Sequence, residues 1–493
     1  MNYLSTRNKQ LSVTASQAIL KGLSDDGGLF VPESVPVLTT SLEELSKMSY
    51  KEVAYDVMSR FFTDFTEEEL KNCIDRAYDS KFETANIAEM KKADDAWFLE
   101  LYHGKTIAFK DMALSILPHL LTTSAKKNGV KEEIVILTAT SGDTGKAALA
   151  GFADVPGTRI IVFYPKDGVS RVQELQMVTQ KGDNTKVIAI KGNFDDAQTG
   201  VKQMFNNKEL NAALKEKGFL FSSANSINIG RLIPQVVYYV FAYAQLLKKG
   251  EIKSGEKINI VVPTGNFGNI LAAYYAKRMG LPVNKLICAS NENKVLFDFF
   301  TTGTYDRNRD FILTTSPSMD ILISSNLERL IFHSAGDDSD KCAALMEELK
   351  KTGKYTITED MKANMQDFLG GYASEKQVSE VIGKIFKDSS YVIDTHTAVG
   401  ASVYEAYRAE SGDNTVSVIA STASPYKFSR AVVGGLLGKE FTKEDDFELI
   451  DMLHDLSGVE LPEAVKEIKT AEVRHTTVCE VAEMQAEVEK TLA

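Results

Sequence analysis

Short apolar runs alternate with amphipathic stretches through most of the chain. Each run is rich in aliphatic or β-branched residues, and most are followed by a polar or glycine-containing turn and then by helical periodicity. The runs that we predict to be strands are 134–137, 159–164, 186–190, 258–262, 286–289, 391–393 and 416–420. Continuous apolar strands separated by helices are typical of parallel sheets covered on both faces. The pattern therefore predicts an α/β fold with doubly wound sheets.

Changes in this pattern divide the chain into three predicted regions. Residues 1–92 are mostly helical and polar, residues 93–221 form a smaller α/β lobe, and residues 222–493 form a larger one. Residues 334–390 are charged and amphipathic, without strand-like runs, so we expect a helical insertion within the larger lobe. The tail after about residue 440 is acidic and helical. A length of 493 residues suits this division, because domains commonly have ~100–200 residues.

Composition and charge narrow the range of partners. The net charge of −12 gives no support to binding of nucleic acid or of an anionic membrane. No apolar run approaches the ~20 residues needed to span a bilayer, and the N-terminus lacks the apolar core of a secretory signal. The four cysteines are far apart, which favours reduced thiols without a bound metal. We therefore expect a cytoplasmic protein that acts on small molecules. The expected assembly is a monomer or a homodimer, and the sequence does not distinguish between the two.

Lys110 is the most informative single position. It ends a short apolar stretch, 107–109, so its side chain is expected to be buried. A buried lysine needs a partner or a function, and a desolvated amine can stay neutral near pH 7 and form a Schiff base. A simple ion pair with Asp111 is the structural alternative.

Three polar segments could bind anions. The loop 138–145 and the loop 263–269 each join a predicted strand to a helix and contain glycines that let backbone N–H groups approach a phosphate or carboxylate. The segment 225–231 gathers amides, a hydroxyl and a guanidinium within one turn. Each could also be an ordinary turn or helix cap. Combined with a Schiff-base lysine, however, they suggest an enzyme that uses pyridoxal 5'-phosphate (PLP).

These motifs together resemble the threonine synthase family, which belongs to the fold-type II PLP enzymes. The resemblance rests on segments that follow in family order, namely 3–7, 22–33, the Lys110 motif, Ser141-Gly142-Asp143-Thr144-Gly145, 191–196, 225–231, 265–269, 317–321 and 325–329. It implies two doubly wound parallel-sheet lobes with a helical N-terminal region and a helical insertion. The smaller lobe would carry Lys110 and the loop 138–145, and the larger lobe would carry the loop 263–269.

The resemblance also implies a role for each segment. Lys110 would bind PLP covalently and then act as acid and base. The residues that would bind the rest of the cofactor are Gly265, Asn266, Phe267, Gly268 and Asn269 at its phosphate and Thr422 at its pyridine nitrogen. The substrate would be held by Ser141, Gly142, Asp143 and Thr144 at its carboxylate and by Asn225, Ser226 and Arg231 at its phosphate. Lys105 replaces a usual proline and could add a cation to the phosphate pocket or lie on the surface. Ser424 replaces a frequent histidine beside the contact to the pyridine nitrogen.

The implied reaction converts O-phospho-L-homoserine and water to L-threonine and phosphate by γ-elimination and β-hydration, as a PLP-dependent carbon–oxygen lyase. Two alternatives stay open. A fold-type II serine or threonine dehydratase needs no substrate phosphate pocket, so the segment 225–231 argues against it. The other alternative is a non-catalytic, PLP-binding relative of the family, and an intact Lys110 argues against it.

Overall fold

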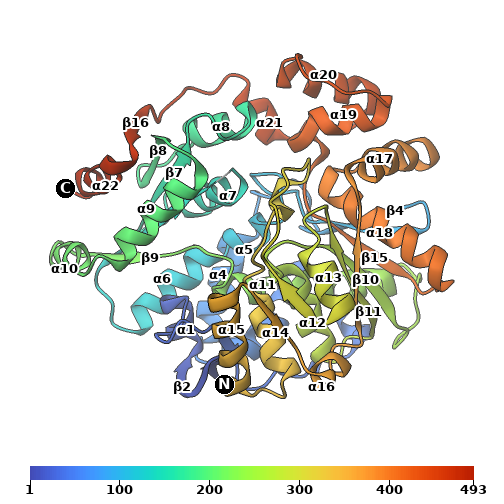
Figure 1. The fold of residues 1–493 in the computed structure, drawn as a ribbon, viewed down its shortest axis with the longest axis horizontal. Coiled ribbons are helices and arrows are strands. Elements are labelled where there is room, and N and C mark those ends of the chain that lie inside the picture. Colours follow the sequence, from blue (N-terminus) through green and yellow to red (C-terminus); the bar gives the residue numbers. More distant parts are fainter. Residues whose placement is uncertain (141) are drawn as a thin grey trace.

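The computed structural model describes residues 1–140 and 142–493, so the predicted site residue Ser141 lies outside the described residues. Two mainly parallel sheets carry the fold, and helices cover their faces (Figure 1). The smaller sheet has the strand order β16-β8-β7-β6-β9, and the larger has the order β14-β11-β10-β15-β5-β4. The predicted α/β class is therefore confirmed. No helix in the described part of the chain is long and apolar enough to cross a membrane.

The N-terminal region begins with a small antiparallel sheet that the apolar pattern did not predict. Its first two strands are partly exposed and its third, although buried, has only three residues, so they carry little hydrophobic signal. The strands are β1 (Asn2–Ser5), β2 (Asn8–Thr14) and β3 (Phe30–Pro32), and the helices are α1 (Ala15–Lys21), α2 (Leu42–Leu45), α3 (Tyr50–Phe61) and α4 (Glu67–Ala77). Thr14, Ser41, Ser49 and Thr66 each start one of these helices with a capping box, which satisfies free backbone N–H groups.

The smaller sheet confirms three of the predicted strands. Its strands are β6 (Glu133–Ala139), β7 (Thr158–Pro165), β8 (Thr185–Lys191), β9 (Phe219–Ser222) and β16 (Thr477–Glu480), all parallel to their neighbours. The helices along this part of the chain are α6 (Leu117–Lys127), α7 (Asp143–Phe152), α8 (Arg171–Val178), α9 (Phe194–Asn206) and α10 (Lys208–Glu216). Val135, Ile161 and Ile188 are buried in this lobe, as a sheet covered on both faces requires.

The larger sheet confirms three further predicted strands. Its strands are β4 (Glu89–Ala93), β5 (Ala96–Glu100), β10 (Ile258–Pro263), β11 (Val283–Ser290), β14 (Phe368–Tyr372) and β15 (Ser417–Ser421), and only the edge strand β4 is antiparallel. The main helices around it are α11 (Ile229–Lys248), α12 (Gly268–Arg278), α17 (Glu375–Ser389), α18 (Thr395–Ser411) and α19 (Ser429–Leu437). Because β5 pairs with β15, the strand that leads to Lys110 belongs to this sheet, although residues from 93 onward were expected in the smaller lobe.

Two predictions within the larger lobe are wrong. Residues 391–393 form no strand and lie in the connection between α17 and α18; this short apolar run is buried by side-chain packing, without strand pairing. The expected helical insertion, 334–390, also contains strands. Its elements are α15 (Ser339–Thr352), β13 (Lys354–Thr356), α16 (Glu359–Ala363), β14 and α17. The sequence of β14 includes Gly370 and Gly371, so it lacks the β-branched run by which strands are recognised.

The C-terminal tail links the two lobes. Helices α20 (Asp446–Ser457) and α21 (Glu463–Ile468) lie beside α19 and α8, and the chain then continues to β16, which pairs with β8 of the smaller sheet (Figure 1). Helix α22 (Met484–Thr491) packs on α9. The end of the chain is therefore part of the smaller lobe, whereas residues 222–493 were all expected in the larger one. The remaining elements are α5 (Asp111–Leu114), α13 (Val295–Thr302), β12 (Thr304–Asp306), η1 (Pro317–Met319), α14 (Leu327–Ser334), η2 (Pro425–Phe428) and η3 (Val481–Glu483).

Candidate active site

A cavity lies where β5, β10 and β15 of the larger sheet end, facing the start of α7 from the smaller lobe. This is where ligands are expected in α/β proteins, beyond the carboxyl ends of the strands. The predicted site residues that line it are Lys110, Asp143, Thr144, Asn225, Ser226, Arg231, Gly265, Asn266, Phe267, Gly268, Asn269 and Thr422. Segments that are far apart in the sequence therefore meet at one site.

Two predicted residues do not line this cavity. Lys105 is exposed to solvent and is not among the lining residues, which favours the surface alternative over the pocket role. Gly142 lies just before α7, and its backbone N–H donates to Thr140 Oγ1 at 2.9 Å. The N–H of Gly145 donates to the same oxygen at 3.0 Å. These two amides are thus used within the loop and are not directed at a ligand.

Lys110 is held against the end of β15. The backbone N–H of Phe109 donates to the Thr422 carbonyl at 2.8 Å, and Ala108 forms an isolated bridge with Ala423. The Lys110 amine donates to Ser318 Oγ at 3.2 Å and lies 3.7 Å from Asp143 Oδ2. Burial lowers the pKa of Lys110, and the neighbouring Asp143 only partly opposes this effect.

The alternative of an ion pair with Asp111 is not what the structure has. The Asp111 carboxylate accepts hydrogen bonds from the backbone N–H of Thr106 at 2.8 Å and from its hydroxyl at 2.6 Å. It therefore organises the turn before Lys110 and leaves the Lys110 amine to the cavity.

Asp143 is the hydrogen-bonding centre of the site. Its Oδ1 accepts from Gln173 Nε2 at 3.1 Å and lies 3.2 Å from the Lys427 amine. Its Oδ2 accepts from Ser318 Oγ at 3.0 Å. Burial alone raises the pKa of Asp143, but Lys427, Lys110 and His396 outweigh burial and hold the pKa well below its usual range. Asp143 is therefore a buried anion that is fully engaged by donors of the protein.

The loop 263–269 joins β10 to α12 and passes very close to the backbone of the segment that carries Ser318. A Cβ atom on Gly265 would lie 2.6 Å from the Ser318 carbonyl oxygen, so only glycine fits there. Phe267 has a left-handed backbone with a φ of 65°, and no side chain caps the helix that follows. An uncapped helix N-terminus in a cavity carries free N–H groups and a partial positive charge, which suit a phosphate.

Asn269 adds a donor at the same place. Its Oδ1 accepts from the hydroxyl of Tyr238 at 2.8 Å and from that of Tyr239. Its Nδ2 is buried and has no hydrogen-bond partner in the described part of the chain. A buried amide without a partner is costly, so a ligand acceptor is expected at this position.

Arg231 is the second group that lacks a partner. It is only 4% exposed, its Nη1 donates to the Ala224 carbonyl at 2.9 Å, and its Nε has no partner among the described residues. No carboxylate of the described residues forms an ion pair with it, and burial lowers its pKa to about 10. The Ser226 hydroxyl beside it is also buried without a partner. A buried guanidinium of this kind requires an anion.

The end of the cavity at Thr422 is built by α18 and β15. The Thr422 N–H donates to Thr397 Oγ1 at 3.3 Å. Ser424, where a histidine is frequent in the family, accepts from the Tyr426 N–H at 3.3 Å and so caps η2. The substitution at Ser424 is therefore accommodated by local backbone hydrogen bonding.

Sequence reasoning missed several groups at the site. The cavity is also lined by Ser318, Met319, Gln235 and His396. Lys427 is not among the lining residues, but its amine lies 3.2 Å from Asp143 Oδ1. The His396 Nδ1 is paired with Asp394 at 2.8 Å, and its Nε2 accepts from the Ser318 N–H at 3.2 Å. Ser318 and Met319 lie in the motif 317–321, which is the one signal that could have identified them. His396 and Lys427 lie next to irregular segments, where periodicity carries no information.

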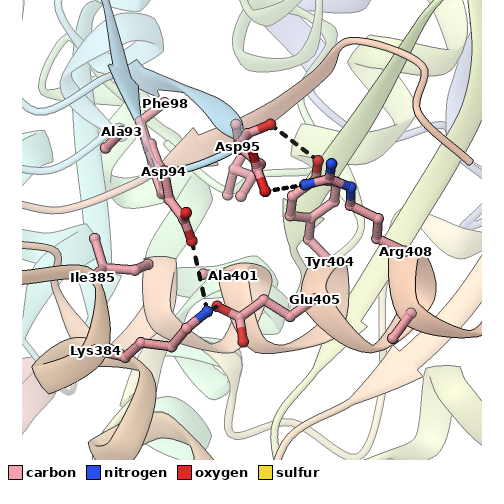
Figure 2. A pocket seen from close by; sticks show the side chains of 13 residues that line it. Ala93, Asp94, Asp95, Phe98, Lys384, Ile385, Ala401, Tyr404, Glu405 and Arg408 are labelled. Atoms are coloured by element: carbon pink, nitrogen blue, oxygen red, sulfur yellow. Dashed lines mark hydrogen bonds and ion pairs between the residues drawn. The ribbon is translucent and has the colours of Figure 1, made fainter. Parts of the chain in front are cut away.

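A second cavity, of about 450 Å³, lies on the larger lobe between the β4–β5 turn and the helices α17 and α18 (Figure 2). Its cations are paired with carboxylates, as Figure 2 shows. Lys384 lies 2.8 Å from Glu405 and 3.6 Å from Asp94, and Arg408 pairs with Asp95. None of the predicted site residues that the structure describes lines it. The unpaired groups around Lys110 therefore make the first cavity the candidate active site.

The donor set of this first cavity fits PLP. A buried amine with a lowered pKa can bind the aldehyde, the α12 N-terminus with Asn269 Nδ2 can bind the phosphate, and Thr422 lines the same cavity. Arg231 and Ser226 are further donors, so the cavity has groups for a second anion as well.

Comparison with known proteins adds independent findings. Three families match the chain, described as "Threonine synthase N terminus" over residues 2–78, "Pyridoxal-phosphate dependent enzyme" over residues 82–423 and "Threonine synthase, C-terminal" over residues 397–488. The threonine synthase of Schizosaccharomyces pombe is 37% identical over 466 residues, which cover 88% of each chain. Human threonine synthase-like 1 is 38% identical over 88% of this chain, which spans 59% of that protein's length. The crystal structure of PLP-bound threonine synthase from Brucella melitensis has a TM-score of 0.88 at 34% identity and covers 100% of this chain and 99% of its own.

Proposed function

Because the chain belongs to the threonine synthase family of PLP-dependent lyases, we propose that the cavity around Lys110 is its active site and that O-phospho-L-homoserine is its substrate. The reaction then consumes water and yields L-threonine and phosphate. This proposal combines the family membership of the whole chain with the unpaired groups at one cavity.

The observation that carries the choice of substrate is the buried Arg231. Its guanidinium lacks a carboxylate partner among the described residues, and the Ser226 hydroxyl and Asn225 lie beside it at the cavity. A phosphate group matches the planar fork of arginine and accepts several charge-assisted hydrogen bonds. Each such bond contributes roughly 1.5–3 kcal/mol. This pocket would therefore hold the phosphate that leaves from the substrate.

A second group of residues that line the cavity is proposed to hold the cofactor. Lys110 would bind PLP covalently, the loop 265–269 with the start of α12 would hold its phosphate, and Thr422 would face the pyridine nitrogen. When bound, PLP supplies an electron sink for negative charge that develops on the substrate carbons. Lys110 carries the amine that lines the cavity in the described part of the chain, and it would take and return protons at those carbons.

The loop at the start of α7 is proposed to hold the substrate carboxylate through Thr144. The Asp143 side chain is a poor candidate for that contact, because it is itself an anion and already accepts from Ser318 and Gln173. We assign Asp143 instead to the organisation of the amines around it.

The two alternative functions are less well supported. A dehydratase acting on serine or threonine handles no substrate phosphate, and the buried Arg231 would then remain without an anion. A buried amine with a lowered pKa at the cavity is also suited to proton transfer, which a non-catalytic PLP-binding protein does not carry out. We also retain a cytoplasmic location and a monomeric or homodimeric state as predictions, which fractionation and light scattering can test.

The test of the phosphate pocket is the variant Arg231→Met, with Arg231→Lys as the matched control. Loss of the buried cation is expected to lower kcat/KM for O-phospho-L-homoserine ~10²-fold, because at least one charge-assisted contact to phosphate is lost. Lysine keeps the charge without the fork, so Arg231→Lys is expected to retain intermediate activity. Both variants should bind PLP with normal visible absorbance. A variant that turns over normally, or that loses PLP, would show that Arg231 does not bind the substrate phosphate.

A further inference from the structure

A second buried lysine shares the carboxylate beside Lys110. The Lys427 side chain, in η2, is fully buried, and its amine lies 3.2 Å from Asp143 Oδ1 and donates to the Thr106 carbonyl at 2.8 Å. The Lys110 amine is farther from the same carboxylate, 3.7 Å from Oδ2. Ser318 Oγ accepts from Lys110 at 3.2 Å and donates to Asp143 at 3.0 Å, so it bridges the two groups.

The contacts of Asp143 with Lys427 and Ser318 bear on the protonation state of the Lys110 amine. A lysine that must form a covalent bond needs a neutral amine, whereas a buried carboxylate in direct contact would hold it as a protonated ion pair. Asp143 lies close enough to Lys110 to have that effect. Instead, its two oxygens are already occupied by Lys427, Ser318 and Gln173.

We propose that Lys427 is a positioning residue. Together with Ser318, it pairs with the Asp143 carboxylate oxygens and so leaves the Lys110 amine available for bond formation. Lys427 reaches this place from the larger lobe, and Asp143 from the smaller lobe, so their contact also fixes the start of α7 against the end of β15. The inference rests on the proposed role of Lys110 as the lysine that binds PLP.

The surrounding charges agree with this assignment. Lys110 interacts electrostatically with Asp143, Lys427 and Arg231. Asp143 also interacts with His396. Lys427 also interacts with Asp111 and Lys146. Burial lowers the pKa of Lys110, Asp143 raises it, and both Lys427 and Arg231 lower it further. The Asp143 carboxylate lies closer to the Lys427 amine, at 3.2 Å, than to the Lys110 amine, at 3.7 Å. Removing the Lys427 charge therefore changes the pKa of Lys110 in one direction, upward.

The test follows the rate at which the PLP-free full-length chain binds added PLP covalently, measured by visible absorbance over a range of pH. The rate rises with pH as Lys110 loses its proton, and its midpoint reports the Lys110 pKa. In Lys427→Gln the midpoint should move up by ~1 pH unit, which slows the reaction about tenfold at neutral pH. Lys427→Arg keeps the charge and should leave the midpoint in place. In the double variant Lys427→Gln with Asp143→Asn the midpoint should return to or below its original value.

Ser318→Ala provides a second route to the same answer if Lys427→Gln does not fold. It removes a donor from Asp143 Oδ2, leaves that oxygen to Lys110, and should also shift the midpoint upward. An unchanged or lowered midpoint in the folded Lys427→Gln or Ser318→Ala variant would overturn the inference. Lys110→Ala separates this outcome from failure of the proposed function: covalent attachment of PLP that persists in Lys110→Ala, detected by mass after reduction with borohydride, would refute the role of Lys110 itself.

Discussion

At the scale of single residues, the site contains buried charged side chains, some with an oppositely charged partner and one with none among the described residues. Lys110 and Asp143 are buried within 3.7 Å of each other, and Arg231 is buried with no carboxylate beside it among the described residues. Buried charges are retained where they bind something or react. The sequence motifs identified Lys110 and Arg231, because each stands in a recognisable segment. They did not identify Lys427, whose contact with Asp143 exists only after both lobes have folded.

Substitutions of Lys110 and of Lys105, five positions before it, should have very different effects on turnover. Lys110→Ala removes the only amine that lines the cavity among the described residues and is expected to lower turnover of O-phospho-L-homoserine by at least ~10²–10⁴-fold, the usual range for loss of a general acid or base. Lys105→Ala should leave turnover within about twofold, because Lys105 is exposed and lies outside the cavity. Steady-state kinetics of both purified variants would check this. Strong loss in Lys105→Ala would restore its predicted role in the phosphate pocket.

At the scale of elements, strand ends and helix starts place the site. β10 ends at Pro263 and α12 begins at Gly268, so the loop between them presents backbone N–H groups at the carboxyl edge of the sheet. These elements were predictable, because long apolar runs and glycine turns mark them. The strand β14 and the connection 391–393 were not, because a glycine-containing edge strand resembles a loop and a buried loop resembles a strand in hydrophobic pattern alone.

The β10–α12 loop should be sensitive to one added methyl group. In Gly265→Ala the new Cβ would meet the Ser318 carbonyl at 2.6 Å, which forces the loop or the segment 317–319 to move. PLP affinity is expected to fall about tenfold or more, because the backbone N–H groups lose their alignment. Titration of the PLP-free chain with PLP would compare Gly265→Ala with the unsubstituted chain, and equal affinities would contradict the steric argument.

At the scale of the whole molecule, the C-terminal tail connects the two lobes around the cavity. After α21 the chain leaves the larger lobe, and β16 completes the edge of the smaller sheet beside β8 (Figure 1). Met484, Val488 and Leu492 are buried in the core of the smaller lobe. The acidic residues and helical periodicity of the tail did not predict this docking. Pairing between strands that are far apart in the sequence depends on the shape of the exposed sheet edge.

The docked tail should therefore contribute to stability. Met484 contacts Gly200 of α9, and Met484→Ala is expected to reduce the free energy of unfolding by ~2–5 kcal/mol, as for other buried methionines. Glu489→Ala, on the exposed face of α22, should change it by less than ~0.5 kcal/mol. Urea unfolding of the full chain would measure the difference. Equal stabilities would mean that the tail is not firmly packed on the smaller lobe.

The most direct test of the account is the product balance with O-phospho-L-homoserine. The PLP-loaded chain would be incubated with this substrate, and released phosphate and L-threonine would be quantified together. We predict equal amounts of the two products, without accumulation of a 2-oxo acid or ammonia. Phosphate release without threonine, or no turnover while PLP stays bound, would contradict the proposed function.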